Sequence, residues 1–138
     1  MKDLEIARTR LKEGNLSLVV VKHGKIIFET ESSGLKGFLQ VIELLGRELV
    51  ESSVADKIMG RAAALLSVFS CVSAVFAVTI SEEGIKVLED NNIPYQFERC
   101  VPSILNSKGN DTCPFEKLIM TFANPAEAYA KLKSLIKT

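Results

Sequence analysis

The chain has 138 residues, of which 47% are hydrophobic and 25% are charged. This length and composition suit a single globular domain over residues 1–138 and exclude a disordered chain. The 17 basic and 17 acidic side chains cancel, so charge gives no support for a nucleic-acid polymer or a membrane surface as a partner.

The three cysteines, Cys71, Cys100 and Cys113, are far apart in the sequence, and no two form a CxxC pair. We therefore expect neither a disulfide framework nor a zinc knuckle. Residues 1–14 mix charges and lack the apolar core of a signal peptide. The apolar stretch 62–80 has a β-branched and aromatic second half, which favours a buried helix followed by a buried strand over a membrane span. The sequence predicts a soluble cytoplasmic protein.

The first part of the chain alternates clear periodic segments with turn residues. Gly14-Asn15 and His23-Gly24 are typical of a helix end and of a hairpin turn. The predicted elements, in chain order, are a helix at 2–13, strands at 16–22 and 25–30, and a helix at 35–46.

The segment 53–69 is predicted to be one helix, polar in its first two turns and then apolar on almost every side, as in a helix buried in a core. The strand 72–80 is apolar on both faces, which is typical of the middle of a covered sheet. Further elements are a helix from Ser81 to about 91, a strand at 95–101, and helices beginning at 113–116 and 124–127. This order predicts a three-layer α/β/α sandwich around a mixed sheet. Ligands bind such sheets at the carboxyl ends of strands, near helix N-termini.

The first candidate site lies in the polar part of the predicted central helix. Ser53 and Asp56 fit an N-cap followed by an acid three residues later. Lys57 and Arg61 are four residues apart, so they would share a face near the positive end of the helix dipole, which disfavours cations. An anion would remove this conflict, and helix N-termini bind phosphate readily.

The anion can be a carboxylate of this chain, such as Glu82 or Glu116, or the phosphate of a ligand. Gly60 lacks a Cβ and would let either approach closely. Ser81 is predicted to cap the next helix, with Glu82 either completing the helix start or facing Lys57. These alternatives remain open at the level of sequence.

Two residues are candidates for covalent catalysis. Cys113 lies at a helix start, where the dipole favours the thiolate, although no histidine is near it in sequence to act as a base. Burial of Lys57 beside Arg61 would favour its neutral amine, which is the nucleophilic form.

The stretches ADKIMGRAAALL (55–66) and NDTCPFE (110–116), with the order of elements, resemble a small family of uncharacterised prokaryotic proteins that share the cytidine-deaminase-like fold. In that fold two zinc-binding motifs lie at the starts of the helices flanking the middle strand, which we expect at 55–64 and 79–84. A zinc deaminase has His or Cys and a catalytic Glu in the first motif and two Cys in the second. Neither segment has these ligands, and His23 lies in a hairpin turn, so we expect no zinc.

The sequence predicts a protein of unknown function that binds a small anionic ligand, a nucleotide or phosphorylated nucleoside, in a zinc-less cleft. The predicted ligand-binding residues are Ser53, Asp56, Lys57, Gly60, Arg61, Ser81, Glu82, Cys113 and Glu116. One alternative is an enzyme that uses Cys113 or Lys57 covalently. Another is a structural or oligomeric domain with a buried ion-pair network. A homodimer is compatible with the resemblance, because related folds often self-associate.

Overall fold

The computed structural model describes residues 2–32 and 34–136. Its elements, in chain order, are α1 (Lys2–Glu13), β1 (Leu18–Lys22), β2 (Lys25–Thr30), α2 (Leu35–Leu45), the 3-10 helix η1 (Gly46–Leu49), β3 (Ser53–Met59), α3 (Arg61–Phe69), β4 (Ala74–Ser81), α4 (Glu82–Asp90), β5 (Tyr95–Val101), α5 (Pro114–Ile119) and α6 (Pro125–Leu135).

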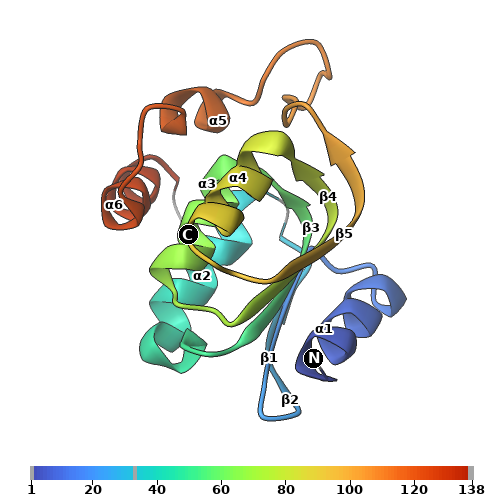
Figure 1. Ribbon diagram of the computed structural model, residues 1–138. Helices are drawn as coiled ribbons and strands as arrows, with labels where there is room; N and C mark the ends of the chain where they lie inside the picture. Colours follow the sequence, from blue (N-terminus) through green and yellow to red (C-terminus); the bar gives the residue numbers. More distant parts are fainter. Residues whose placement is uncertain (1, 33, 137–138) are drawn as a thin grey trace.

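A five-stranded mixed sheet in the order β2-β1-β3-β4-β5 forms the middle layer (Figure 1). Strand β1 is antiparallel to both β2 and β3, whereas β3, β4 and β5 are mutually parallel. Four strands therefore point the same way, and the carboxyl ends of β2, β3, β4 and β5 lie at one edge of the sheet. The chain enters α2, α3 and α4 from this edge.

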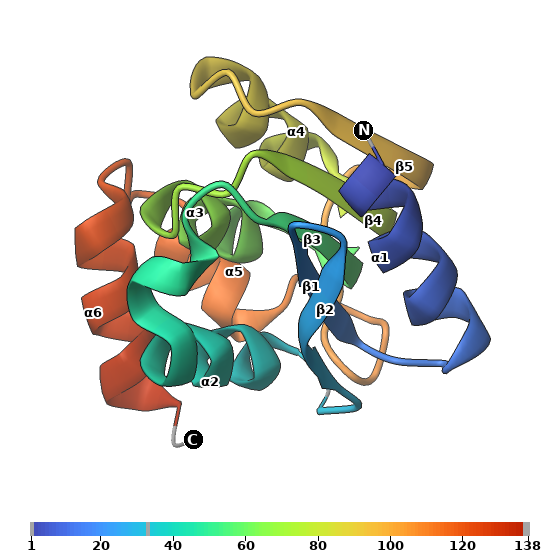
Figure 2. The ribbon, with the colours of Figure 1, turned by 90° about the horizontal axis from the view of Figure 1, so that it is seen from below.

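The two faces of the sheet carry different numbers of helices. Helix α1 alone covers one face, where Leu4, Ala7 and Leu11 are buried with Val19 and Phe76. Helices α2, α3 and α4 cover the other face, and α6 packs against α3 (Figure 2). The predicted three-layer α/β/α sandwich with a mixed sheet is confirmed. Within the described part of the chain, no helix is both long enough and apolar enough to cross a membrane.

Local sequence signals set most of the element boundaries. Asn15, with a φ of 50°, follows α1 in the left-handed conformation that terminates helices. His23 and Gly24 also have positive φ values and make the tight turn between β1 and β2. Ser81 caps α4 by accepting a hydrogen bond from the Gly84 N–H at 3.0 Å, and Asn124 caps α6 in the same way.

The prediction of one helix over 53–69 is wrong. Residues 53–59 form β3, the middle strand, in which Val54 pairs with Val20 on one side and Val75 on the other. Gly60 is extended, with φ −100° and ψ −165°, and α3 begins after it. Ser53, Asp56 and Lys57 break the apolar pattern that is typical of a covered strand. Because the segment leads directly into the apolar stretch of α3, its sequence resembles the polar start of that helix.

Candidate functional site

Two adjoining hollows lie at the carboxyl edge of the sheet and share residues 102–104. The helix-start cavity, about 170 Å³, is bounded by the beginnings of α3 and α4 and by α5. The strand-end groove, about 430 Å³, lies over the ends of β3, β4 and β5. The remaining lining residues of the cavity are Arg61, Ser81, Glu83, Thr112, Glu116 and Met120, and those of the groove are Ile58, Thr79, Arg99, Val101 and Leu105.

The carboxylate of Glu116 caps the N-terminus of α3. Its Oε1 accepts a hydrogen bond from the Arg61 N–H at 2.7 Å, and its Oε2 accepts one from the Ala62 N–H at 2.9 Å. A Cβ on Gly60 would lie only 2.2 Å from Glu116 Oε1, so glycine is what permits this approach. Glu116, one of the two carboxylates that the sequence offered as an anion for the helix predicted at 53–69, thus binds the start of α3 at residues 61 and 62.

Burial decides the electrostatics of this carboxylate. Glu116 is only 9% exposed, and the loss of solvation raises its pKa above the ordinary value. The two backbone N–H groups and the Arg61 guanidinium partly offset that rise, whereas the negative charge of Glu83 adds to it. The cavity thus holds two carboxylates and one guanidinium, an unfavourable setting for a further anion.

The guanidinium of Arg61 is fully engaged by protein groups. Its Nε donates to the Ile119 carbonyl at 3.3 Å, and its Nη2 donates to the Phe122 carbonyl at 2.7 Å. Its Nη1 lies 3.7 Å from Glu83 Oε1. Through these hydrogen bonds Arg61, the first residue of α3, binds the end of α5 and the residues that follow it. The role of its side chain is therefore structural.

Asp56 is a buried acid in the middle strand. It lies between Leu18 of β1 and Ala77 of β4 in the sheet register, and its Oδ1 accepts a hydrogen bond from the Ile58 N–H at 3.3 Å. Desolvation raises its pKa to about 8, although backbone N–H groups of Ile58 and Lys57 oppose the rise. Its carboxyl group therefore binds a proton far more tightly than an exposed aspartate does.

The strand-end groove has a different chemistry. Its apolar surface comes from aliphatic side chains, of which Ile58 and Leu105 are about half exposed. Its polar side chains are those of Arg99, Thr79 and Ser103, and none of the three has a hydrogen-bond or ion-pair partner among the described residues. An unpaired guanidinium and two free hydroxyl groups over an aliphatic surface can bind an anion that has an apolar part.

The structure brings together only part of the predicted site. Gly60, Arg61, Ser81 and Glu116 meet at the helix-start cavity. Ser53 lies at the opposite end of β3, opposite Val21 and Ala74, because 53–59 is a strand rather than a helical turn.

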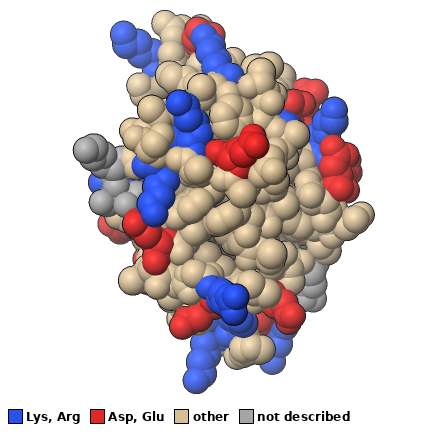
Figure 3. Space-filling view, turned by 90° about the vertical axis from the view of Figure 1, so that its left-hand side faces the viewer, with Lys and Arg blue, Asp and Glu red and all other residues tan. Residues whose placement is uncertain are grey.

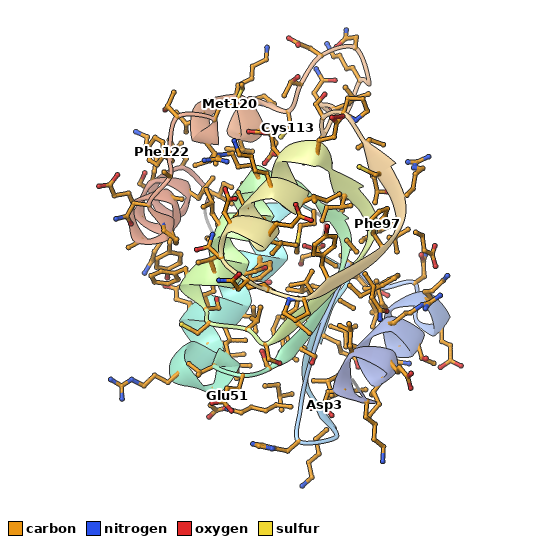
Figure 4. All side chains as sticks on the ribbon, in the orientation of Figure 1. Asp3, Glu51, Phe97, Cys113, Met120 and Phe122 are labelled. Atoms are coloured by element: carbon orange, nitrogen blue, oxygen red, sulfur yellow. The ribbon has the colours of Figure 1, made fainter. Side chains whose placement is uncertain are left out.

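The other predicted residues lie outside both hollows. Lys57 is exposed on β3 and shares no helix face with Arg61, so the predicted clash of cations does not occur. The burial that a nucleophilic Lys57 requires is also absent. Glu82 is exposed in the first turn of α4, and Cys113 is half-buried at the start of α5 (Figure 4). Neither Glu82 nor Cys113 lines the cavity or the groove.

Sequence reasoning missed Arg99, Thr79 and Glu83. Arg99 and Thr79 face each other across neighbouring strands, and alternation along 95–101 could have placed Arg99 beside residues 95 and 97. Nothing local in the sequence indicates that 102–105 folds over these strand ends.

The strand order also changes where zinc motifs would lie. The resemblance puts them at the helices flanking the middle strand, and the middle strand is β3, so those helices are α2 and α3. The segment 79–84 instead leads into α4. The first turns of α2 and α3 read Leu-Lys-Gly-Phe and Arg-Ala-Ala-Ala. No group of three or more His, Cys, Asp or Glu side chains in the described residues is arranged to hold a metal ion.

A comparison with family models matches residues 6–136 to the domain of unknown function DUF1893. The chain belongs to the DUF1893 family. The crystal structure of a DUF1893 family protein from Thermotoga maritima shares 28% sequence identity with it and superposes with a TM-score of 0.90, over 97% of this chain and 90% of that chain. A comparison with curated proteins finds no match.

The DUF1893 fold is also similar to a second solved structure, Acinetobacter baumannii RibD. The identity is 14% and the TM-score 0.50, over 69% of this chain and 34% of that chain. This likeness concerns the fold alone and agrees with the cytidine-deaminase-like fold expected from the sequence.

Proposed function

We propose that the protein binds a small anionic ligand of the nucleotide or phosphorylated nucleoside class in the strand-end groove, without zinc. The observation that supports this is the convergence of Arg99, Thr79 and Ser103, all unpartnered among the described residues, on one groove. Its volume of about 430 Å³ is within the range of small-molecule sites.

The chemistry of the groove fits the two parts of such a ligand. A guanidinium forms paired hydrogen bonds with phosphate oxygens. The aliphatic side chains of Ile58, Val101 and Leu105 offer an apolar surface for a base or sugar. The helix-start cavity is less suitable, because Glu116 already occupies its backbone N–H groups.

The setting in the cell is part of the same proposal. All three cysteines are free thiols, and Cys71 and Cys100 are exposed, which suits a reducing cytoplasm. Both signs of charge are intermingled on the face that shows α6 (Figure 3), so this face offers no uniform basic surface to a nucleic-acid polymer.

Titration calorimetry with a nucleoside monophosphate, the matching nucleoside and ribose 5-phosphate tests the proposal. We expect the monophosphate to bind more tightly than the nucleoside and Arg99→Gln to weaken binding about tenfold or more, as for loss of a charged hydrogen bond. Lys57→Met is the matched control, since it removes an exposed cation of β3 that does not line the groove, and we expect unchanged binding. Loss of binding in Lys57→Met alone would instead place the ligand at the site predicted from the sequence, and no binding by any of these compounds would refute the proposal.

A structural role is the second candidate, and the Glu116 network favours it. Without a ligand, Glu116 accepts hydrogen bonds from the backbone N–H groups of residues 61 and 62. The Arg61 guanidinium donates to the Phe122 carbonyl and pairs with Glu83. Under this alternative, the protein purifies without a bound small molecule, and Arg99→Gln has no effect on any binding measurement.

A further inference from the structure

Strand β5 forms a free edge of the sheet. Among the described residues it pairs with β4 alone, and all five residues from Gln96 to Cys100 are exposed. The seven-residue strand contains no proline, and its third residue, Phe97, is 42% exposed. A long edge with an exposed aromatic residue is a template for pairing with another strand.

The backbone groups that face outward can be identified from one hydrogen bond. The Val75 N–H of β4 donates to the Pro94 carbonyl at 3.0 Å, so the backbone of Pro94 faces β4. Backbone groups point to alternate sides along a strand. Those of Gln96 and Glu98 therefore face β4, and those of Tyr95, Phe97 and Arg99 face away from the sheet.

We propose that β5 pairs with β5 of a second copy of this chain, antiparallel and about a two-fold axis at Phe97, to give a continuous sheet across a homodimer. In this register Phe97 lies opposite Phe97 of the partner subunit, and Tyr95 lies opposite Arg99 of the partner subunit. The outward backbone groups of these residues then exchange pairs of hydrogen bonds across the axis.

The side chains of β5 are complementary to themselves in this register. The rings of Tyr95 and Phe97 stack with their centroids 6.2 Å apart, and the two-fold axis extends this stack through the partner's Phe97 and Tyr95. On the other face, the Gln96 amide can donate to the carboxylate of the partner's Glu98.

Glu98 is already held in place for this contact, because Lys12 and Arg8 of α1 pair with its carboxylate. Neighbouring registers fit less well. A shift of two residues in one direction puts Glu98 opposite its own copy, which is a repulsive pair. A shift of two residues in the other direction leaves Arg99 opposite Ile93, beyond the end of the strand.

The interface goes beyond ligand binding, and the variants that test it lie at Phe97 and Gln96, neither of which lines the groove. Sedimentation equilibrium of the full chain measures the mass. We expect a dimer for the unmodified chain and monomers for Phe97→Lys and for Phe97→Glu, because each puts like charges together at the two-fold axis. An equimolar mixture of the two variants is expected to restore a dimer, since the charges at the axis are then opposite.

Leu44→Lys is the matched control, since Leu44 is 71% exposed on α2 and lies outside β5, and it is expected to remain a dimer. Gln96→Glu, which faces the partner's Glu98, is expected to weaken the dimer about tenfold, and Gln96→Lys is expected to tighten it. Gln96 is exposed, so its two variants keep the test valid if a change at Phe97 impairs folding. A monomeric unmodified chain, a dimer that survives Phe97→Lys, or a variant mixture that stays monomeric would overturn the proposal.

Discussion

Removal of the Glu116 carboxylate is the most direct perturbation of the network at the helix starts. The two hydrogen bonds that it accepts, at 2.7 and 2.9 Å, come from the first two backbone N–H groups of α3. These groups have no partner within their own helix. Glu116→Ala therefore leaves two donors unsatisfied at the positive end of the helix.

The magnitude follows from the number of bonds and from burial. A hydrogen bond to a charged group contributes about 1.5–3 kcal/mol, so two such bonds contribute roughly 3–6 kcal/mol. Burial raises the pKa of Glu116, because desolvation disfavours the charged carboxylate. This desolvation offsets part of the free energy that the two hydrogen bonds contribute. We expect a loss of about 3 kcal/mol in the free energy of unfolding for Glu116→Ala. Glu116→Gln keeps one acceptor, and we expect it to lose roughly half as much.

Urea unfolding at neutral pH, followed by far-ultraviolet circular dichroism, measures these changes. With a typical denaturant dependence, Glu116→Ala lowers the midpoint by about 1–2 M. The matched control is Glu82→Gln, which removes an exposed charge from the first turn of α4 and costs under about 0.5 kcal/mol. The reasoning is refuted if Glu116→Gln and Glu82→Gln change the midpoint equally.

Further predictions concern the close packing at Gly60 and the buried acid. Gly60→Ala is expected to lower the free energy of unfolding by about 2 kcal/mol, because the added Cβ displaces the Glu116 carboxylate, and to lower it less when Glu116 is already alanine. Urea unfolding of the unmodified chain, the two single variants and the double variant measures this coupling. Strictly additive changes in the free energy of unfolding would contradict the contact. The pKa of Asp56 is about 8 in the folded state and near 3.9 unfolded, so the folded state holds a proton that the unfolded state releases, and stability falls as the pH rises from about 4 to 8. Asp56→Asn lacks this loss, so its stability relative to the unmodified chain is expected to increase between about pH 5 and pH 8; a difference that does not vary with pH would refute a buried protonated Asp56.

Local chemistry made a large part of this fold predictable. Ser81 and Asn124 cap helices, and His23-Gly24 turns the hairpin, because each acts on backbone groups within a few residues of itself. The segment 53–59 was predicted wrongly because its polar residues resemble the polar start of the buried helix that follows it in the chain. What separates them is the pairing of β3 with β1 and β4, which the sequence of the segment does not contain.

At the candidate site, too, some features could be predicted from nearby residues, whereas others depend on residues that are distant in the sequence. The pair Lys57 and Arg61 predicted an anion near the start of a helix at 53–69, and Glu116 was among the carboxylates considered. Only the tertiary structure decided that Glu116, 55 residues from Arg61, supplies it. The groove around Arg99 had no counterpart in the sequence analysis, because it forms where 102–105 crosses three strand ends.

The sequence by itself determined the α/β layers, most helix starts and the balance of charge, since these depend on composition and on contacts between near neighbours. The tertiary structure decided the middle strand, the partner of the α3 N-terminus, the position of the groove and the free edge at β5. These features depend on which distant segments lie side by side, and that is set by packing of the whole chain rather than by any one segment.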